Sequence, residues 1–255
     1  MGEVIRLEHI VKRFYLGQPN ELEILHDINF SVQEGEFVSI VGPSGSGKST
    51  LMNLIGVLDR PTEGRYFLDG IDLSRVTDNE LSDIRNKKIG FVFQTYNLIA
   101  KTNAQKNVEL PMLYAGLGRS ERRARARELL EMVEMTDRAR HLPEELSGGM
   151  KKRGAIARAL ALDPDIIVAD EPTSALDVSV RAQVLNLLQD LKAALGLGLV
   201  FISHDINTVR HVSDRIAVMY LGRILETGPT EEIFARPRQD YTRTLLGAAP
   251  SLLGA

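Results

Sequence analysis

The stretch Gly42-Pro43-Ser44-Gly45-Ser46-Gly47-Lys48-Ser49-Thr50 decides the fold of this chain. It follows a short apolar run from Phe37 to Val41 and precedes Thr50 to Leu58, whose apolar residues have helical spacing. A strand, a glycine-rich loop and a helix in this order form the phosphate-loop pattern. Its glycines let backbone N–H groups point at a phosphate, and the helix N-terminus adds positive potential. An incidental glycine-rich turn is the alternative, and the flanking elements favour the phosphate loop.

Four side chains in two places carry the chemistry that this pattern predicts. We expect Lys48 to reach the β- and γ-phosphates of a nucleotide and Ser49 to place its hydroxyl on Mg²⁺. The apolar run from Ile166 to Ala169 reads as a strand buried on both faces, and it ends in Asp170 and Glu171. Asp170 suits Mg²⁺, directly or through water, and Glu171 suits activation of the attacking water as a general base. Two acids after a strand can also form an ordinary turn, but beside a phosphate loop the functional interpretation is favoured.

A second glycine-rich segment, Leu146-Ser147-Gly148-Gly149, precedes an alanine-rich helical stretch that ends near Leu162. Ser147 is a natural N-cap for this helix, and capping alone would explain it. Two glycines beside a serine at a helix start also make an anion site. The chain thus offers two phosphate-binding helix ends, and one nucleotide would not obviously need both.

The remaining pattern alternates strands with helices, which predicts an α/β fold with a mostly parallel sheet flanked by helices. Two strands near the N-terminus flank a polar turn at Gly17-Gln18-Pro19-Asn20. These two strands are expected at Leu7–Tyr15 and Ile24–Val32. Four further strands are expected at Arg65–Leu68, Ile89–Phe93, Leu199–Ser203 and Arg215–Tyr220, and a long helix at Val180–Leu195.

The segment from about Asp78 to Leu146 is mainly helical and polar, with Pro111 and Pro143 expected as breaks. A charged helix is expected from Ser120 to Met135. It holds a basic cluster that could be a nucleic-acid patch, but interspersed Glu121, Glu128 and Glu131 favour a solvated helix face. The cluster consists of Arg119, Arg122, Arg123, Arg125 and Arg127.

Composition removes several classes of protein. The chain has 255 residues and no cysteine, which excludes disulfides, zinc–thiolate sites, iron–sulfur clusters and cysteine nucleophiles. It has 31 Lys and Arg against 34 Asp and Glu, so a chain built to coat nucleic acid is not expected. The most apolar stretch, Leu195 to Ile202, has two glycines and is far too short to span a bilayer. Met1 to Arg6 alternates polar and apolar residues, which indicates a strand and not a signal peptide.

Taken together, the motifs resemble those of ATP-binding cassette (ABC) ATPases over nearly the whole chain. The residues that carry the resemblance, in the family's order, are Gly42–Thr50, Gln94, Leu146–Gly149, Ile166–Glu171, Ser174-Ala175-Leu176-Asp177 and His204. The resemblance implies one P-loop NTPase cassette over residues 1–255, with an antiparallel N-terminal β subdomain. Residues 1–77 and 160–255 would form the β subdomain and phosphate-loop core, and about 78–159 a helical subdomain with the LSGG motif.

The resemblance also implies how the two anion sites are used. In this family two cassettes pair head to tail, and each ATP lies between the phosphate loop of one and the LSGG motif of the other. Ser147, Gly148 and Gly149 would then serve the partner's nucleotide, and Asp177 would cross the dimer interface. The resemblance implies a homodimer or a heterodimer with a second cassette.

Further roles follow from the resemblance. Gln94 would contact Mg²⁺ or the attacking water and sense the membrane partner, and His204 would contact the γ-phosphate. Phe14 lies where the family places an aromatic that stacks on adenine; Tyr15 is the rival, and a core aromatic is the alternative for both. The expected cofactors are ATP and Mg²⁺. A separate transmembrane permease would contact residues Gln94 to Asn107, so the chain would be cytoplasmic and peripheral at the inner face of the membrane.

Two departures concern the subfamily and not ATP binding. After LSGG the family is usually glutamine-rich, whereas this chain has Met150-Lys151-Lys152-Arg153. Two added charges near a γ-phosphate site could alter dimer closure or its salt dependence.

The second departure is a mixture of subfamilies. The stretch from Val57 to Leu113 resembles ATPases of lipoprotein release and macrolide export. Arg215–Gly228, Tyr241-Thr242-Arg243 and Ala249-Pro250 resemble oligopeptide and dipeptide importers. This mixture leaves cargo and direction open, and fits a divergent natural cassette or a constructed chimera.

Two alternatives are a non-hydrolysing scaffold gated by nucleotide, against which the presence of Glu171 argues, and a soluble ABC protein that acts on ribosomes or DNA. Ribosome-acting members usually carry two cassettes in one chain, and this chain has a single set of motifs. DNA-repair members place a long coiled coil between phosphate loop and LSGG, and Thr50 to Leu146 has no sustained heptads. A transport ATPase without a nucleic-acid partner is therefore expected.

Overall fold

A computed structural model describes residues 2–248 of the chain, in two compact units. The first unit consists of Met1–Arg75 and Gly198–Ala255, and the second is the continuous segment Val76–Leu197. The units differ from the expected subdomains because residues 160–197 group with the second unit, and the expected boundaries remain a prediction. Ala249-Pro250, which belong to the importer-like part of the resemblance, lie outside the described residues.

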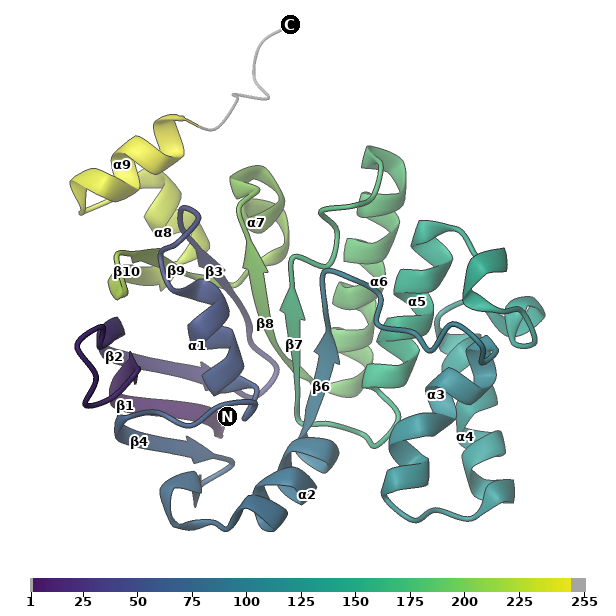
Figure 1. The fold of residues 1–255 in the computed structure, drawn as a ribbon. Helices are drawn as coiled ribbons and strands as arrows, with labels where there is room; N and C mark the ends of the chain where they lie inside the picture. Colours follow the sequence, from purple (N-terminus) through teal and green to yellow (C-terminus); the bar gives the residue numbers. More distant parts are fainter. Residues whose placement is uncertain (1, 249–255) are drawn as a thin grey trace, which may run out of the picture. The chain divides into compact units, whose positions relative to one another are not determined.

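The first unit contains an antiparallel sheet with the strand order β2-β1-β4-β5 (Figure 1). Its strands are β1 (Glu3–Phe14), β2 (Leu22–Gln33), β4 (Glu63–Leu68) and β5 (Ile71–Asp72). Ile5 and Leu7 of β1 and Leu25 and Ile28 of β2 are buried, so the two long strands share an apolar face. The antiparallel N-terminal β subdomain is thus confirmed, with strands longer than expected.

The phosphate loop starts from the second sheet of this unit, in which β10, β9, β3 and β8 follow one another. The strands are β3 (Phe37–Val41), β8 (Gly198–Ser203), β9 (Arg215–Tyr220) and β10 (Arg223–Pro229). β3 runs parallel to both β8 and β9, and all five of its residues are buried. A parallel strand covered on both faces needs a continuous apolar run, which explains why this one was recognisable.

Helices complete the first unit. α1 (Lys48–Ile55) follows the phosphate loop, and a one-turn helix η1 (Leu73–Arg75) ends the N-terminal part. β10 and the short helices α7 (Ile206–Val212), α8 (Thr230–Ala235) and α9 (Asp240–Gly247) were not expected from the sequence. Helices of six to eight residues are too short for a clear periodic signal.

The second unit combines a parallel strand pair with helices. β6 (Ile89–Val92) pairs with β7 (Ile166–Asp170), and α2 (Asp78–Lys88) leads into β6. α3 (Ala104–Tyr114) contacts both α4 (Arg119–Met132) and α5 (Gly148–Ala159) (Figure 1). The remaining elements are η2 (Thr136–Arg138), η3 (Pro143–Glu145) and α6 (Val178–Leu195). The mostly parallel α/β fold and its helical part are therefore confirmed.

The expectation that Pro111 breaks the chain was wrong, because Pro111 lies inside α3. A proline removes one backbone hydrogen bond and crowds the carbonyl four residues before it. Here Val108 and Met112 on either side are fully buried, and α3 packs on α4 and α5. Packing on both flanks outweighs the local penalty. Pro143, by contrast, begins the one-turn helix η3.

Within residues 2–248, none of the helices is both long enough and apolar enough to cross a membrane.

Candidate functional site

The phosphate loop of the first unit combines two glycines in the left-handed conformation with a helix start that has no side-chain cap. Gly45 and Gly47 have φ values of 77° and 97°, in the left-handed region that glycine adopts without strain. Gly47 is the N-cap of α1 and supplies no side-chain cap, so the first N–H groups of the helix are not capped by a side chain. Among the described residues, the buried Oγ of Ser46 has no hydrogen-bond partner. Lys48 Nζ donates to the carbonyl oxygens of Gly42 at 2.8 Å and Pro43 at 2.7 Å, which holds the ammonium over the loop.

His204 lies at the same edge of the sheet as this loop. β3 and β8 are parallel, and Val41 is the register partner of Ser203. Gly42 and His204 are the next residues, so the loop and the histidine leave the sheet side by side. Asp205 follows as the N-cap of α7 and accepts hydrogen bonds from the N–H groups of Asn207 and Thr208. The cap fixes the turn on which His204 stands.

In the second unit a parallel pair brings Gln94 and the two acids together. Val92 of β6 is the register partner of Ala169 of β7, so Gln94 and Glu171 each follow two residues later at one edge. Glu171 has a φ of 39°, a left-handed conformation that costs a non-glycine residue energy. Its carbonyl oxygen accepts hydrogen bonds from the N–H and the hydroxyl of Ser174, at 3.2 and 3.1 Å. These two bonds close the turn in which Glu171 keeps its left-handed conformation.

The LSGG segment begins α5 as expected. Ser147 is the N-cap, and its Oγ accepts a hydrogen bond from the N–H of Met150 at 3.3 Å. A Cβ on Gly148 would come within 2.9 Å of the Tyr96 hydroxyl, and one on Gly149 within 2.5 Å of Val180 Cγ1. Tyr96 therefore packs closely against Gly148 and Val180 against Gly149, and any larger residue at either position would displace these side chains. The cap is present, and a second role in binding an anion stays a prediction.

Asp177 is the N-cap of α6. Its Oδ1 accepts hydrogen bonds from the N–H of Val180 and the hydroxyl of Ser179, both at 2.9 Å. The bond from Val180 and then that from Ser179 hold the pKa of Asp177 below its usual value. The two hydrogen bonds fix the carboxylate, and its expected place at a dimer interface stays a prediction.

Neither candidate for adenine stacking is a core aromatic. The exposed fractions are 37% for Phe14, the last residue of β1, and 57% for Tyr15, which has a φ of 57°. The ammonium of Lys12 lies 5.1 Å from the centroid of the Phe14 ring, and it also donates to Asp59 Oδ1 at 2.7 Å. Both rings are therefore accessible to a ligand, and Phe14 has a fixed cation beside it.

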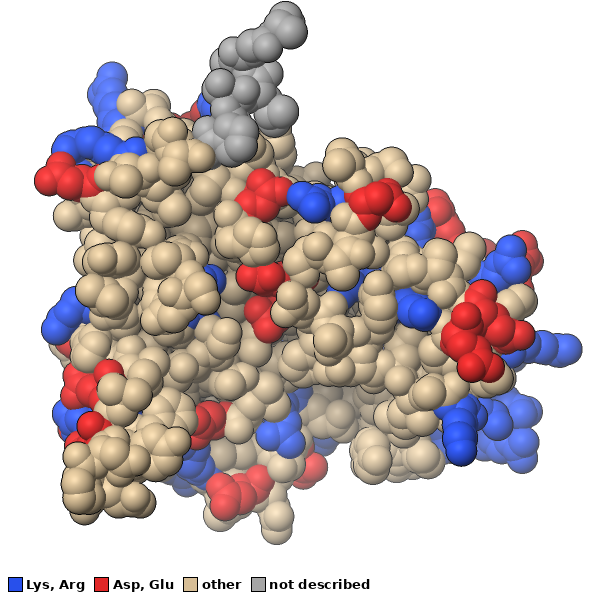
Figure 2. Space-filling model, turned by 45° about the horizontal axis from the view of Figure 1, so that its top comes forward, with Lys and Arg blue, Asp and Glu red and all other residues tan. Residues whose placement is uncertain are grey.

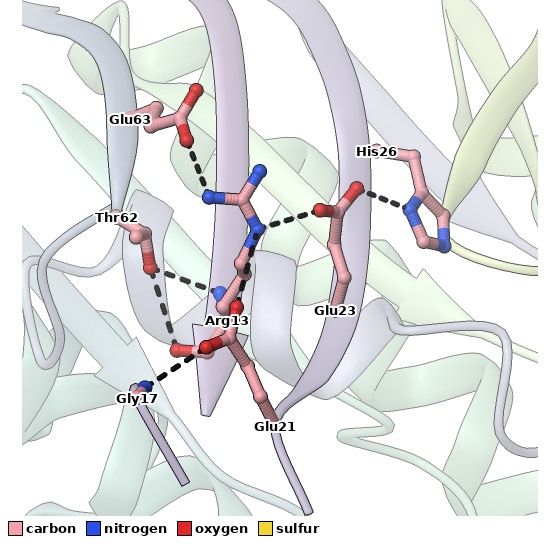
Figure 3. A network of polar contacts seen from close by, with 7 residues as sticks. All are labelled: Arg13, Gly17, Glu21, Glu23, His26, Thr62 and Glu63. Carbon is pink, nitrogen blue, oxygen red and sulfur yellow. Dashed lines mark hydrogen bonds and ion pairs between the residues drawn. The ribbon is translucent and has the colours of Figure 1, made fainter. Parts of the chain in front are cut away.

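A network of polar contacts holds the strand end that carries Phe14 (Figure 3). Arg13 Nε donates to Glu23 at 2.7 Å, its guanidinium also pairs with Glu63, and its backbone N–H donates to Thr62 Oγ1 at 2.9 Å. Contacts of Glu23 with His26 and then with Arg13 hold the pKa of Glu23 below its usual value. Sequence analysis missed this network, because its members are up to 50 positions apart in the chain.

Lys152 has a different place from the one expected. It is 1% exposed, and its Nζ donates to the carbonyl oxygens of Phe93 at 2.7 Å and Gln94 at 3.1 Å. Burial lowers the pKa of Lys152 to about 8, although the charge of Asp170 acts in the opposite direction. The expectation that Lys151 and Lys152 both add charge beside a γ-phosphate therefore needs correction. Lys152 points into the second unit and holds the backbone of the predicted site residue Gln94.

Sequence analysis also missed a cationic groove in the second unit. It has a volume of about 820 Å³ and is lined by residues of α3, α4 and the segment before α3, and by Arg140, which follows η2. Figure 2 shows Lys and Arg side chains gathered at the lower right, over this part of the second unit. The side chains that line the cationic groove include six cations and one carboxylate, namely Lys106, Arg119, Arg122, Arg123, Arg127, Arg140 and Glu109.

The cations of this groove are not neutralised by the acids on the same helix. Arg125, which does not line the groove, pairs with Glu128 at 3.2 Å and also with Asp163. Arg122 and Arg127 instead donate to backbone carbonyl oxygens, and the single carboxylate, Glu109, accepts from the Gln105 amide at 2.8 Å. The prediction that acids of α4 offset its arginines thus applies to Arg125, which pairs with Glu128. It does not apply to the arginines that line the groove.

Comparisons with known proteins agree with the motifs. The sequence pattern of the family described as "ABC transporter" matches residues 25–174. The methionine import ATP-binding protein MetN 1 of Rhodococcus jostii is 44% identical over 95% of this chain and 71% of its own length. The dipeptide transport ATP-binding protein DppF of Haemophilus influenzae is 44% identical over 95% of this chain and 75% of its own length. The ABC transporter ATP-binding protein YknY of Bacillus subtilis is 47% identical over 87% of this chain and 95% of its own length.

The fold is also that of solved cassettes. A dimeric structure of the ATP-binding cassette MJ0796, in a post-hydrolysis state bound to ADP and Pi, superposes with a TM-score of 0.80 and 43% identity. It covers 89% of this chain and 98% of that one. A second dimeric structure of the same bacterial ABC transporter cassette gives a TM-score of 0.80 at 44% identity. The chain therefore belongs to the ABC transporter family, as an ATP-binding and ATP-hydrolysing subunit.

Proposed function

We propose that this subunit binds MgATP through the residues singled out above and hydrolyses it while paired with a second cassette. The observation that supports this best is the register of the two parallel strand pairs. It aligns the phosphate loop with His204 in one unit, and Gln94 with Asp170 and Glu171 in the other. These residues thus lie at the carboxyl ends of strands, where ligands of open α/β sheets bind. They are of the types that phosphoryl transfer uses.

The chemistry assigned to each side chain is positioning and charge stabilisation. In this proposal, N–H groups of Gly42–Thr50 and the ammonium of Lys48 hold the β- and γ-phosphates. Glu171 accepts a proton from the attacking water, and Gln94 and His204 orient that water and the γ-phosphate. The bond from the γ-phosphorus to the bridging oxygen breaks, and ADP and phosphate leave. The strained backbone of Glu171 supports its role, since such strain is common at functional sites.

A magnesium ion fits the donor set. Ser49, Asp170 and Gln94 would supply a hydroxyl, a carboxylate and an amide oxygen, the hard ligands that Mg²⁺ prefers. Over residues 2–248 there is no group of three or more His, Cys, Asp or Glu side chains that could hold a metal alone. The ion would therefore complete its shell with phosphate oxygens and water, as Mg²⁺ in nucleotide sites does. When bound, it would neutralise charge on the phosphates.

Pairing with a second cassette, identical or different, gives the LSGG segment its function. Ser147, Gly148 and Gly149 would bind the γ-phosphate of the partner's nucleotide, and Asp177 would lie at the interface. The N-terminus of a twelve-residue helix capped only by a serine suits an anion. The similar cassette named above is dimeric, which supports the arrangement.

A transmembrane permease is proposed as the second partner, which would place the chain in the cytoplasm at the inner face of a membrane. The expected contact segment, Gln94 to Asn107, runs into the cationic groove, whose lining includes Ile99, Thr102 and Asn103. With six cations and one carboxylate, the groove suits an acidic protein loop. The near balance of charges over the whole chain, by contrast, gives no reason to propose nucleic acid as a partner.

The decisive test of the catalytic assignment is Glu171→Gln. The variant should bind ATP with wild-type affinity but hydrolyse it at least 100-fold more slowly, since general bases contribute about 10²–10⁴-fold. Size-exclusion chromatography with ATP should show a trapped dimer. A variant that hydrolyses ATP at the wild-type rate would contradict the role of Glu171.

The sandwich is tested by mixing two inactive chains. Lys48→Ala should lose tight ATP binding, and Ser147→Arg should place a bulky cation where the partner's γ-phosphate binds. A mixed dimer has one intact site, composed of Lys48 from one chain and Ser147 from the other, and should regain part of the activity. Mixed dimers confirmed by mass spectrometry but without activity would speak against LSGG acting across the dimer.

A further inference from the structure

Helix α5 holds the segment that contains Gln94 through a buried lysine. The Nζ of Lys152 donates to the carbonyl oxygens of Phe93 and Gln94, at 2.7 and 3.1 Å, and lies 5.0 Å from the centroid of the Tyr96 ring. Lysine is rarely buried to 1% exposure unless its charge is compensated. Here the direct contacts are backbone carbonyl oxygens and a ring of one short segment, and the charge of Asp170 adds to the compensation.

A second cation of α5 contacts the same segment. Arg158 donates through its guanidinium to the carbonyl oxygens of Asn97 at 2.6 Å and Tyr96 at 3.5 Å. Lys152 and Arg158 are six positions apart on the helix, and together they bind four carbonyl oxygens between residues 93 and 97. Tyr96 also packs its hydroxyl against Gly148 in the first turn of α5.

We infer that Lys152 is a positioning residue for Gln94: it ties the backbone of residues 93–97 to α5, so that Gln94 moves with the helix that begins at Ser147. The inference rests on the role proposed above for Gln94. The link is short and stiff, because both carbonyl bonds originate from one ammonium and charged hydrogen bonds are about twice as strong as neutral ones. A phosphate bound at the N-terminus of α5 would thereby set the position of Gln94 in the same chain.

The inference predicts that loosening the link affects turnover and not nucleotide binding. Lys152→Met keeps a side chain of similar length and removes the donor. It should lower kcat between about 10- and 100-fold, as small misplacements of site residues do. The KM for ATP should stay within twofold, because the phosphate loop is untouched. Lys152→Gln keeps an N–H donor and should retain most of the rate. Lys87→Met, an exposed lysine of α2, is the matched control for the lost charge.

A readout that needs no nucleotide makes the test independent of activity. The chain has no cysteine, so Thr95→Cys carries a nitroxide spin label at a single exposed position beside Gln94. In the nucleotide-free full chain, Lys152→Met should increase the mobile fraction of the spectrum. Lys152→Gln and Lys87→Met should leave the spectrum as in the parent chain.

Each outcome decides. A tight label in Lys152→Met overturns the inference, as does a loosened label with an unchanged kcat, or a Gln variant no better than the Met variant. If Lys152→Met does not fold by circular dichroism, Lys152→Ala replaces it, since it also removes the donor, and a tight label there overturns the link. Gln94→Ala is measured in parallel. If that variant keeps its kcat, the proposed role of Gln94 fails, while the label still shows whether Lys152 holds the segment.

Discussion

Phe14→Ala should weaken ATP binding while leaving triphosphate recognition intact. Phe14 is the last residue of β1, where it pairs with Leu22, and the Arg13 network fixes the strand beside it. Stacking of a base on an aromatic ring is worth about 1–3 kcal/mol. At tenfold per 1.4 kcal/mol, loss of the ring should raise the Kd for ATP about 5- to 140-fold.

The fold should tolerate this change. A fully buried phenylalanine costs about 3–5 kcal/mol when truncated to alanine, but 37% of Phe14 is already exposed, so its cost is smaller. Thermal unfolding of the variant should therefore stay close to that of the wild type. A large drop in the unfolding temperature would show that Phe14 serves the core and not a ligand.

Isothermal titration with two ligands separates base from phosphate. ATP should bind Phe14→Ala weakly, while inorganic tripolyphosphate should bind it as it binds the wild type. Tyr15→Ala is the matched control, since Tyr15 is the neighbouring and more exposed aromatic. If Tyr15→Ala loses ATP affinity and Phe14→Ala does not, the assignment passes to Tyr15. Equal losses for ATP and tripolyphosphate would refute stacking by either ring.

Two further predictions concern partner binding and stability. The double variant Arg123→Glu, Arg127→Glu should bind the transmembrane partner more weakly in co-purification, by about 30-fold or more, because a broken interfacial charge pair costs about 2 kcal/mol or more. Arg125→Glu, on the same helix but outside the groove, should leave this binding unchanged. Glu226→Gln should lower the free energy of unfolding by about 1–3 kcal/mol at neutral pH. Burial alone would raise the pKa of Glu226, but the N–H groups of Arg238 and Gln239 hold it below its usual value. The stabilisation is present above the usual pKa and is lost as pH falls through the lowered one, so denaturant melts of the two chains should converge in acid.

The parts of the fold that could be predicted are those whose cause is local. The phosphate loop combines glycines, a lysine and flanking elements within a few positions, and β3 and β7 are continuous apolar runs. Register then follows from parallel pairing, which is why Gln94 and Glu171 could be placed at strand ends. Ser147 was recognisable because capping residues have a strong positional preference, whereas Asp177 was singled out by the family resemblance and its capping of α6 was not foreseen.

The parts that could not be predicted depend on contacts between distant segments. Nothing near Lys152 in the sequence indicates that it is buried; the cause is the carbonyl oxygens of Phe93 and Gln94, nearly sixty positions earlier. The same holds for Arg13 and its partners, and for Pro111, which a helix tolerates only because of what packs around it. The cationic groove requires α3 and α4 to lie together, so the spacing of charges along α4 alone suggested an ordinary surface.

The second unit is one uninterrupted stretch of chain, whereas the first is assembled from the two ends. Two crossovers in a gene, near the codons for residues 75 and 198, would therefore exchange Gln94, the Lys152 link and the cationic groove in a single event. The phosphate loop and His204 would stay behind. Recombination between related genes can thus give a cassette a new transport partner, together with the donor gene's versions of Asp170, Glu171 and the LSGG segment, while its phosphate loop is inherited unchanged.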